Sequence, residues 1–263
     1  MSRKVRTSHM MVYGELRRFP ISIYIKKRFL WFWYSIVHTG GKLSSTMYKI
    51  IYSNYINGHK TYNWLDNVKS ILDDCGCSYI WIYQFYLGSK NMLLNLIDTS
   101  LKTQFKQTRQ SNVNDSSKCI NYRMYKTEHC LEKYFKVLSP HFVQTYTNFR
   151  LCNNFLPVEK GSWLGISRYE RMCNLCNTNS IGDDFHYLFQ CNFFNNERKH
   201  LLPTINSSRN TNTFTFRFIM CETNETKLFK LCHFFKDRSW QSSITTRVFP
   251  TSFFCVMFFF RMY

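Results

Sequence analysis

Acidic residues are scarce in this chain. It has 16 Asp and Glu against 35 Lys and Arg in 263 residues, which gives a formal net charge of +19. A large positive net charge attracts polyanions, most often nucleic acid and sometimes an anionic membrane. It says nothing about the fold. The excess is strongest in residues 1–50, which hold ten Lys and Arg and a single acid, Glu15.

Long hydrophobic runs are missing as well. The two most apolar stretches, 29–37 and 253–260, fall far below the ~20 residues that span a bilayer. The basic start of the chain is not followed by the apolar segment and cleavage site of a secretory signal. We therefore expect no membrane association and an intracellular protein, nuclear and/or cytoplasmic, with reduced thiols. In that setting, eleven cysteines suggest metal ligands or buried thiols before disulfides.

Alternating strand patterns, internal repeats and βαβ units are also absent, whereas helical periodicity recurs. The pattern predicts helices over 21–38, from Ser44-Ser45 to about 57, over 64–76 and over 90–109. A polar loop is expected at 111–118. Further helices are expected after Thr127 as far as Leu138, and from Ser139-Pro140 to about Cys152. We predict a mainly α fold, a helical scaffold followed by a small zinc-binding module, with little or no sheet.

The character of the sequence changes at 157. Residues 157–172 show no regular pattern and are expected to form short, irregular structure. A helix is expected again at 193–202, ending before Pro203. We therefore expect three parts: a basic α-helical region (1–156), a zinc-binding module (157–203) and a short helical or irregular tail (204–263). The last fourteen residues of the tail are expected to be disordered.

Three cysteines and one histidine lie within nineteen residues, in the spacing Cys173-x2-Cys176-x9-His186-x4-Cys191. Three thiolates and one imidazole make a closed structural zinc site with no open position for a substrate. On a continuous α-helix, His186 and Cys191 would be turned by ~140° from each other, a poor common face. The chain is therefore expected to turn between them, or to form a short helix from Asp183-Asp184 to about Cys191. The alternative is that four ligand-type residues meet by chance in a cysteine-rich chain.

Gly182-Asp183-Asp184 also matches a tripeptide of polymerase active sites. A polymerase needs a further carboxylate and a sheet to hold two metal ions, and neither is recognisable here. The two acids are better explained as N-terminal caps of a short helix that contains His186. Of the other candidates, Cys75-x-Cys77 reads as core thiols, and His129-Cys130 as packing on a helix.

The segment NFRLCNNFLPVEKGSWLGISRYERMCNLCNTNSIGDDFHYLFQC resembles the C-terminal region of reverse transcriptases from non-LTR (LINE-type) retrotransposons. The upstream pieces FWYSIVHTGGKLSSTMYKIIY and WLDNVKSILDDCG resemble the same group, and the resemblance covers roughly residues 10–237. In that family a CCHC zinc segment follows the polymerase, and its ligands correspond to Cys173, Cys176, His186 and Cys191. The chain departs from the family pattern at Arg17, Ser162 and Asp184.

The resemblance implies a tail cut from such an element. The aromatic-x-Asp-Asp motif of the family's polymerase is absent, and so are its endonuclease signatures. We therefore expect no enzyme activity, but a nucleic-acid-binding accessory region with Zn2+ as its cofactor. RNA and/or DNA are the expected partners, a separate retrotransposon polymerase is a possible one, and the oligomeric state is open. The candidate nucleic-acid contacts are Arg17, Arg18, Lys26, Lys27, Arg28 and Arg171, with Phe29, Trp31 and Trp33 as stacking aromatics.

Three other readings stay open. The chain is a zinc-stabilised protein-interaction module, a subunit that needs a separate polymerase chain, or a degenerate transposon fragment with no selected activity. For any one of the basic or aromatic residues, a solvated face or a core position is the simpler account.

Overall fold

The computed structural model describes residues 8–154, 156–201 and 213–236. Within these ranges the fold is mainly α, as predicted, and the only β-type pairing is an isolated antiparallel bridge between Met172 and Ile181. None of the described helices is long and apolar enough to cross a bilayer. The expected disorder of the last fourteen residues lies outside the described residues.

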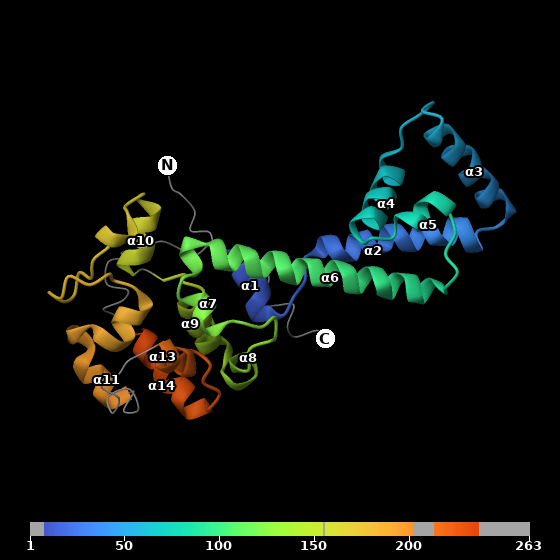
Figure 1. The fold of residues 1–263 in the computed structure, drawn as a ribbon. Coiled ribbons are helices and arrows are strands. Elements are labelled where there is room, and N and C mark those ends of the chain that lie inside the picture. The colour runs from blue at the N-terminus through green and yellow to red at the C-terminus, as the bar shows by residue number, and fades with distance from the viewer. Residues whose placement is uncertain (1–7, 155, 202–212, 237–263) are drawn as a thin grey trace. The chain divides into compact units, whose positions relative to one another are not determined.

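The packing divides the chain into two units after Leu131. The sequence predicted modules that begin at 157 and 204, and those boundaries stay predictions. The first unit, 8–131, has seven α-helices and two short helical turns among its described residues (Figure 1). They are α1 (His9–Leu16), α2 (Ile21–Tyr34), η1 (Ser35–Thr39), α3 (Lys42–Ile56), α4 (Asn63–Asp74), α5 (Ser78–Tyr83), α6 (Lys90–Asp115), η2 (Ser117–Cys119) and α7 (Tyr122–Tyr125).

The core of this first unit lies between α2, α4, α5 and α6. The long α6 runs along α2, and α4 and α5 close the other side. The buried side chains include Ile23, Leu30, Trp33, Leu65, Val68, Ile71, Leu72, Ile80, Trp81, Leu93, Ile97 and Leu101. Their spacing of three and four residues in α2, α4 and α6 matches the periodicity that predicted these helices.

Helix α3 is attached to this core by aromatic side chains. Tyr48, Tyr52 and Tyr55 lie on one face of α3, and their rings contact those of Trp64 and Trp81. The sequence prediction of this helix rested on the spacing of Leu43, Met47, Ile50 and Ile51. The structure leaves the first three exposed, whereas Ile51 packs against the core. The helix was therefore predicted correctly, although most of the side chains used do not belong to its buried face.

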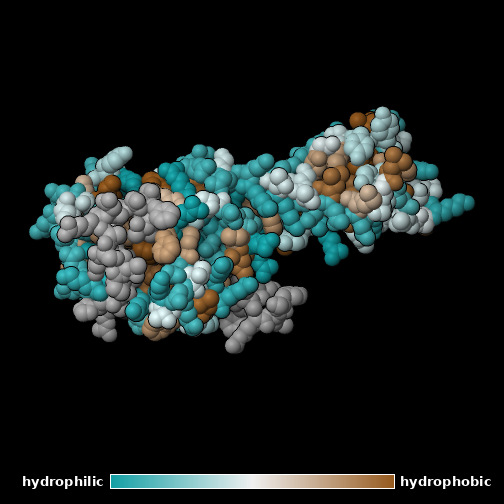
Figure 2. Space-filling view, turned by 60° about the horizontal axis from the view of Figure 1, so that its bottom comes forward, coloured by the Kyte–Doolittle hydropathy of each residue, from teal (hydrophilic) through white to brown (hydrophobic). Residues whose placement is uncertain are grey.

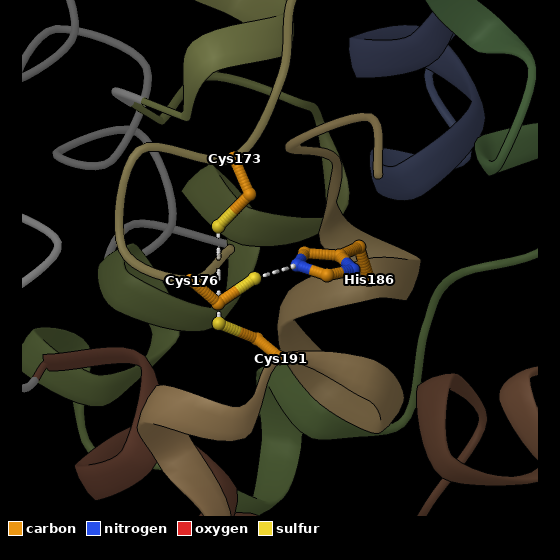
Figure 3. Close-up of side chains that lie close together, drawn as sticks. All are labelled: Cys173, Cys176, His186 and Cys191. Carbon is orange, nitrogen blue, oxygen red and sulfur yellow. Dashed lines mark hydrogen bonds between the residues drawn. The ribbon is translucent and has the colours of Figure 1, made fainter. Parts of the chain in front are cut away.

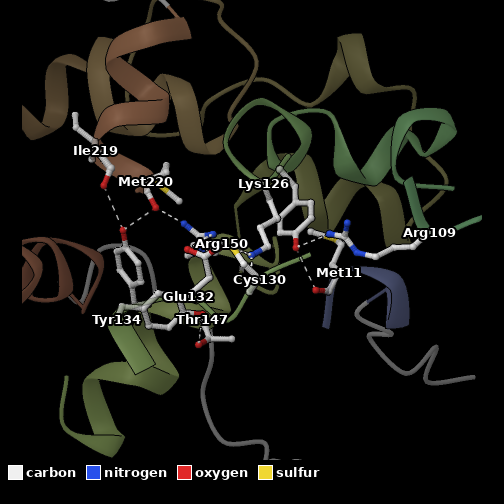
Figure 4. Close-up of polar contacts among 12 residues, drawn as sticks. Met11, Arg109, Lys126, Cys130, Glu132, Tyr134, Thr147, Arg150, Ile219 and Met220 are labelled. Atoms are coloured by element: carbon white, nitrogen blue, oxygen red, sulfur yellow. Dashed lines mark hydrogen bonds and ion pairs between the residues drawn. The ribbon is translucent and has the colours of Figure 1, made fainter. Parts of the chain in front are cut away.

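A buried arginine joins α1 to α6 and α7 in the same unit (Figure 4). Arg109 is 1% exposed; its Nε donates to the Met10 carbonyl at 3.0 Å and its Nη2 to the Tyr122 hydroxyl at 3.2 Å. Gly14 allows the close approach, because a Cβ there would lie 2.1 Å from the guanidinium. A guanidinium taken out of water needs such partners, so the arginine fixes where α1 docks.

The second unit begins at Glu132. Its described helical segments are α8 (Tyr134–Val137), α9 (Pro140–Arg150), α10 (Pro157–Trp163), η3 (Arg168–Glu170), η4 (His186–Gln190), η5 (Asn192–Phe194), α11 (Asn195–Leu201), α13 (Thr213–Met220) and α14 (Glu225–Lys236). Buried Arg150 pairs with Glu132 at 3.3 Å and donates to the Met220 carbonyl, which ties α9 to the end of α13 (Figure 4). The ring of Phe149 stacks on that of Phe235 in α14 at 3.7 Å.

Three local predictions were wrong. Helix α6 continues to Asp115 through the expected loop at 111–118, because Val113 is buried and Ser111 and Asp115 hydrogen-bond along the helix at 3.2 Å. The helix expected after Thr127 is reduced to α8. Buried Lys126 donates from Nζ to the Cys130 carbonyl at 2.6 Å and holds this segment out of helical geometry. Helix α10 replaces the irregular chain expected after 157, with Pro157 in its first turn.

Removing the Tyr48 hydroxyl is expected to destabilise the first unit. Tyr48 accepts a buried hydrogen bond from Trp33 Nε1 at 2.9 Å and donates to Gln84 Oε1. Tyr48→Phe leaves the indole N–H without its partner, so the free energy of unfolding should fall by about 1–3 kcal/mol in urea denaturation. The control Tyr83→Phe, at a 75% exposed position, should change it by less than about 0.5 kcal/mol. Equal effects of the two substitutions would contradict this account of α3.

Candidate metal centre

The four side chains of the predicted zinc site lie together in the second unit (Figure 3). The ligand atoms of Cys173, Cys176, His186 and Cys191 all lie within 4.8 Å of one another. Cys173 Sγ is 3.8 Å from Cys191 Sγ, and Cys176 Sγ is 3.3 Å from His186 Nε2. A tetrahedron with metal–sulfur bonds of about 2.3 Å has edges of about 3.8 Å. The group could therefore hold a metal ion, and no second group of this kind occurs in the described part of the chain.

The first two ligands come from a short hairpin. Cys173 N donates to the Ser180 carbonyl at 2.8 Å, and Gly182 N donates to the Arg171 carbonyl at 2.8 Å, on either side of the Met172–Ile181 bridge. Within the loop, the Leu175 amide donates to Cys173 Sγ at 3.4 Å. The backbone thus directs the Cys173 sulfur toward the interior of the loop.

The other two ligands are brought together by an unusual helical turn. Residues 186–190 form a π-helical turn, and Cys191 N donates to the His186 carbonyl, five residues back, at 2.8 Å. A turn that closes over five residues, rather than four, returns residue i+5 to the same side of the axis as residue i. The wider turn therefore brings His186 and Cys191 to one side of the helix, whereas a regular α-helix would point them in different directions. Of the two expectations, the structure matches the short helix from Asp183-Asp184 to about Cys191, in this wider form.

Asp183 caps that turn. Its Oδ1 accepts the His186 backbone amide at 2.9 Å, and its Oδ2 accepts Arg168 Nη2 at 2.8 Å. The interpretation of Asp183 as a helix cap is therefore confirmed. The ion pair with Arg168 fixes the capping carboxylate, and with it the start of the segment that carries His186.

A second buried arginine supports the last ligand. Arg198 of α11 is 3% exposed and donates to the carbonyls of Tyr187 at 3.1 Å and Cys191 at 2.5 Å, and to Asn195 Oδ1 at 2.5 Å. Three thiolates and a divalent ion would carry a net charge of about −1. The Arg198 guanidinium places a compensating positive charge beside the thiolates. It also donates hydrogen bonds to the Tyr187 and Cys191 carbonyls at the end of the wide turn. Sequence reasoning missed Arg198, because no spacing rule connects it with the ligands.

The thiols of the metal-free group differ in acidity. Burial opposes ionisation of Cys176, but hydrogen bonds from Thr178 and then from Cys173 and His186 lower the pKa of its thiol to about 6. Burial raises the pKa of the Cys191 thiol to about 12, and the neighbouring Cys173 adds to this effect. Near pH 7 the Cys176 thiol of the metal-free centre is therefore mostly ionised, whereas Cys191 is protonated and must release its proton to bind a metal.

Arg171 was a candidate nucleic-acid contact, and in the structure it serves the hairpin. Its Nη1 donates to the Val158 carbonyl at 2.8 Å, and its Nε and Nη2 donate to the Ile166 carbonyl at 2.9 and 2.6 Å. The side chain passes directly over Gly161, where a Cβ would lie 2.5 Å from Arg171 Cγ. These bonds join α10 and the segment after it to the residues that lead into Cys173, which gives Arg171 a positioning role.

The other basic candidates belong to the first unit. Arg17, Arg18 and Arg28 are exposed, whereas Lys26 and Lys27 form ion pairs with Asp74 at 3.3 Å and Asp98 at 2.9 Å. Two of the three proposed stacking aromatics are unsuitable: Trp33 is fully buried, and Phe29 packs against the core. Trp31 remains, 42% exposed, with Lys90 Nζ over its ring at 4.0 Å from the centroid.

The weaker sequence candidates have structural explanations. Cys77 is buried and Cys75 half-buried, in agreement with core thiols. The His129 ring lies 4.8 Å from that of Phe19 and 6.0 Å from that of Phe105, so packing is confirmed for His129. Cys130 is exposed, and the predicted helix does not form there. Comparison with family models, with curated proteins and with solved structures finds no match for this chain.

Adding a methyl group at Gly182 is expected to weaken metal binding. A Cβ there would lie 2.7 Å from Pro157 Cγ and 3.1 Å from Cys173 Cα, so the hairpin would have to shift. Overpacking of this kind costs about 1–3 kcal/mol, and cobalt(II) titrations should show at least a fivefold weaker affinity for Gly182→Ala. Gly41→Ala is the matched control, because a Cβ at Gly41 meets nothing within 4 Å. Equal cobalt affinities for the two variants would refute the role of this close approach.

Cys176 and Cys191 should also differ in their rates of alkylation. The thiolate is the form that reacts with alkylating agents. In metal-stripped protein at pH 7, Cys176 should therefore be carbamidomethylated by a short iodoacetamide pulse well before Cys191, as read by peptide mass spectrometry. Lowering the pH below about 6 should slow Cys176, because its thiolate is then protonated. Faster labelling of Cys191 than of Cys176 would contradict the electrostatics of the site.

Proposed function

We propose that this chain is a non-catalytic nucleic-acid-binding accessory region, derived from a non-LTR retrotransposon reverse transcriptase, with a structural zinc ion. The resemblance described from the sequence supports the origin, and the absent polymerase and endonuclease motifs support the lack of catalysis. The proposed partner is RNA or DNA. The chain then acts in the cell beside a polymerase supplied by another chain.

Zinc is the metal that suits this centre best. Three thiolates and one imidazole in a tetrahedral arrangement are a ligand set that selects zinc over the harder divalent ions. All four positions would be filled by Cys173, Cys176, His186 and Cys191, so the ion would stabilise the fold rather than bind substrate. Structural zinc contributes on the order of 10–16 kcal/mol of apparent binding energy, which a small hairpin and a wide helical turn need to stay closed.

One surface of the first unit supports nucleic-acid binding, and we call it the basic aromatic face. It consists of Tyr24, Arg28 and Trp31 of α2, together with Lys90 at the start of α6. Tyr24, Arg28 and Trp31 are spaced by four and three residues, so they share one side of the helix, and all three are exposed. The Lys90 ammonium lies over the Trp31 ring, and the Arg28 guanidinium lies 6.0 Å from its centroid.

This face is the observation that carries the proposal. Exposed rings beside cations are the combination that binds single strands, since bases stack on the rings while the cations contact phosphates. No ion pair joins Arg28 or Lys90 to an acid within the described ranges. The pairs of Lys26 and Lys27 are partly exposed, so they contribute little to stability and can be exchanged for phosphates.

Binding of full-length protein to fluorescein-labelled single-stranded RNA and DNA over a salt series tests the proposal. The logarithm of affinity should fall with the logarithm of salt, with a slope of several units, at about 0.7 per phosphate neutralised. Tyr24→Ala/Trp31→Ala should weaken binding about tenfold through lost stacking. Arg28→Ala/Lys90→Ala should reduce the slope by about 1.4.

Tyr83→Ala controls for the aromatic substitutions, because Tyr83 is an exposed ring outside the basic aromatic face. Cys173→Ser/Cys176→Ser should abolish metal binding while most of the nucleic-acid affinity remains, because the basic aromatic face belongs to the first unit. Wild-type binding that does not depend on salt, or equal losses for Tyr83→Ala and Tyr24→Ala/Trp31→Ala, would overturn the proposal.

A further inference from the structure

The two exposed rings of the basic aromatic face lie well apart along α2. Tyr24 and Trp31 are separated by seven residues of the helix, which is a rise of about 10 Å along its axis. Bases stacked in a regular strand follow one another at about 3.4 Å, and each has its faces covered by its neighbours. A strand must therefore open its stack at two places before one base can lie on each ring.

Lys90 limits what the Trp31 ring can accept. Its ammonium lies 4.0 Å from the ring centroid and donates to Ser35 Oγ at 2.7 Å, so it is held over one face of the indole. At most one face of Trp31 is then left for a base, and a run of stacked bases cannot continue through this ring. An ammonium has three donors, so Lys90 can still contact a phosphate of the same strand.

The basic aromatic face has few groups that could distinguish one base from another by its edge. Neither this face nor the rest of α2 contains an Asp, Glu, Asn or Gln, and these side chains commonly pair with the edges of cytosine and adenine. Arg28 and Lys90 are the cations that the phosphates of the strand require. Selection among strands should therefore follow how readily a strand unstacks.

Other exposed apolar surfaces of the first unit offer a strand less. Figure 2 shows hydrophobic residues gathered on the part of this unit where α3, α4 and α5 lie. The exposed apolar side chains of α3 carry no ring: they are Leu43, Met47, Ile50 and Ile56. Helix α5 has two exposed rings, Tyr79 and Tyr83, but no cation lies over either of them within the described ranges.

We propose that the basic aromatic face selects flexible, unstacked single strands, so that pyrimidine runs of RNA or DNA bind in preference to adenine runs. Adenines stack strongly on one another along a strand, whereas uracil and thymine stack weakly. An adenine run therefore loses more when two of its bases are separated to reach Tyr24 and Trp31. This inference rests on the proposed nucleic-acid function and adds to it the kind of strand that is bound.

Fluorescence anisotropy of the full-length protein with labelled strands of equal length, at one salt concentration, tests the inference. Oligouridine should bind at least about fivefold more tightly than oligoadenosine, and oligothymidine at least about fivefold more tightly than oligodeoxyadenosine. Tyr24→Ala/Trp31→Ala should remove both preferences. The same double substitution should leave the binding of a DNA duplex unchanged, because a duplex has no free base for the rings.

Tyr83→Ala is the matched control and should keep both preferences, because this exposed ring lies outside the basic aromatic face. The replaced side chains are exposed, so unchanged circular dichroism should show that the variants fold.

Two kinds of failure can be told apart. Equal affinities for pyrimidine and adenine strands, or preferences that Tyr24→Ala/Trp31→Ala leaves intact, would overturn this inference while salt-dependent binding, and with it the proposed function, remained. A preference in the RNA pair alone or in the DNA pair alone would assign the selection to the sugar and contradict the inference as well. Absence of salt-dependent binding to every strand would overturn the proposed function, and this inference with it.

Discussion

The hydrogen bond from Cys191 N to the His186 carbonyl, closed over five residues, is the constraint on which the metal centre depends. It brings a thiol and an imidazole that a regular α-helix would separate to the same side of the chain. Asp183 holds the start of the turn and Arg198 holds its end. The hairpin that carries Cys173 and Cys176 completes the site, and Gly182 permits its close packing against Pro157 and the Cys173 backbone.

Buried cations recur as the means by which helices are joined. Arg109 and Arg150 each connect a helix to a backbone carbonyl far away in the sequence, whereas Arg198 binds nearby carbonyls beside the candidate metal centre. Removing the partner of a buried charge typically costs about 3–5 kcal/mol, so these residues are structural. Four buried cations are nearly balanced by the buried acids Glu15, Glu159 and Asp184, so burial changes the net charge of the described surface little.

Periodicity and ligand spacing allowed much of this structure to be predicted. Apolar spacing located α4, the start signal Ser139-Pro140 located α9, and the cysteine spacing identified four side chains that the fold brings within 4.8 Å. The sequence did not show that Arg171 donates to the carbonyls of Val158 and Ile166, or that Trp33 is buried and bonded to Tyr48. Both features depend on tertiary contacts, which apolar spacing does not reveal. Helix α3 was predicted mostly from residues that face solvent, since apolar spacing identifies one side of a helix without showing whether that side is covered.

The metal content and coordination of the purified protein test the central claim, that residues 173–191 close around a metal ion, most directly. Native mass spectrometry combined with zinc-edge X-ray absorption should find one zinc per chain, bound by three sulfurs at about 2.3 Å and one nitrogen at about 2.0 Å. A metal-free chain, with the Cys173 and Cys191 sulfurs, 3.8 Å apart here, joined in a disulfide, would contradict the account.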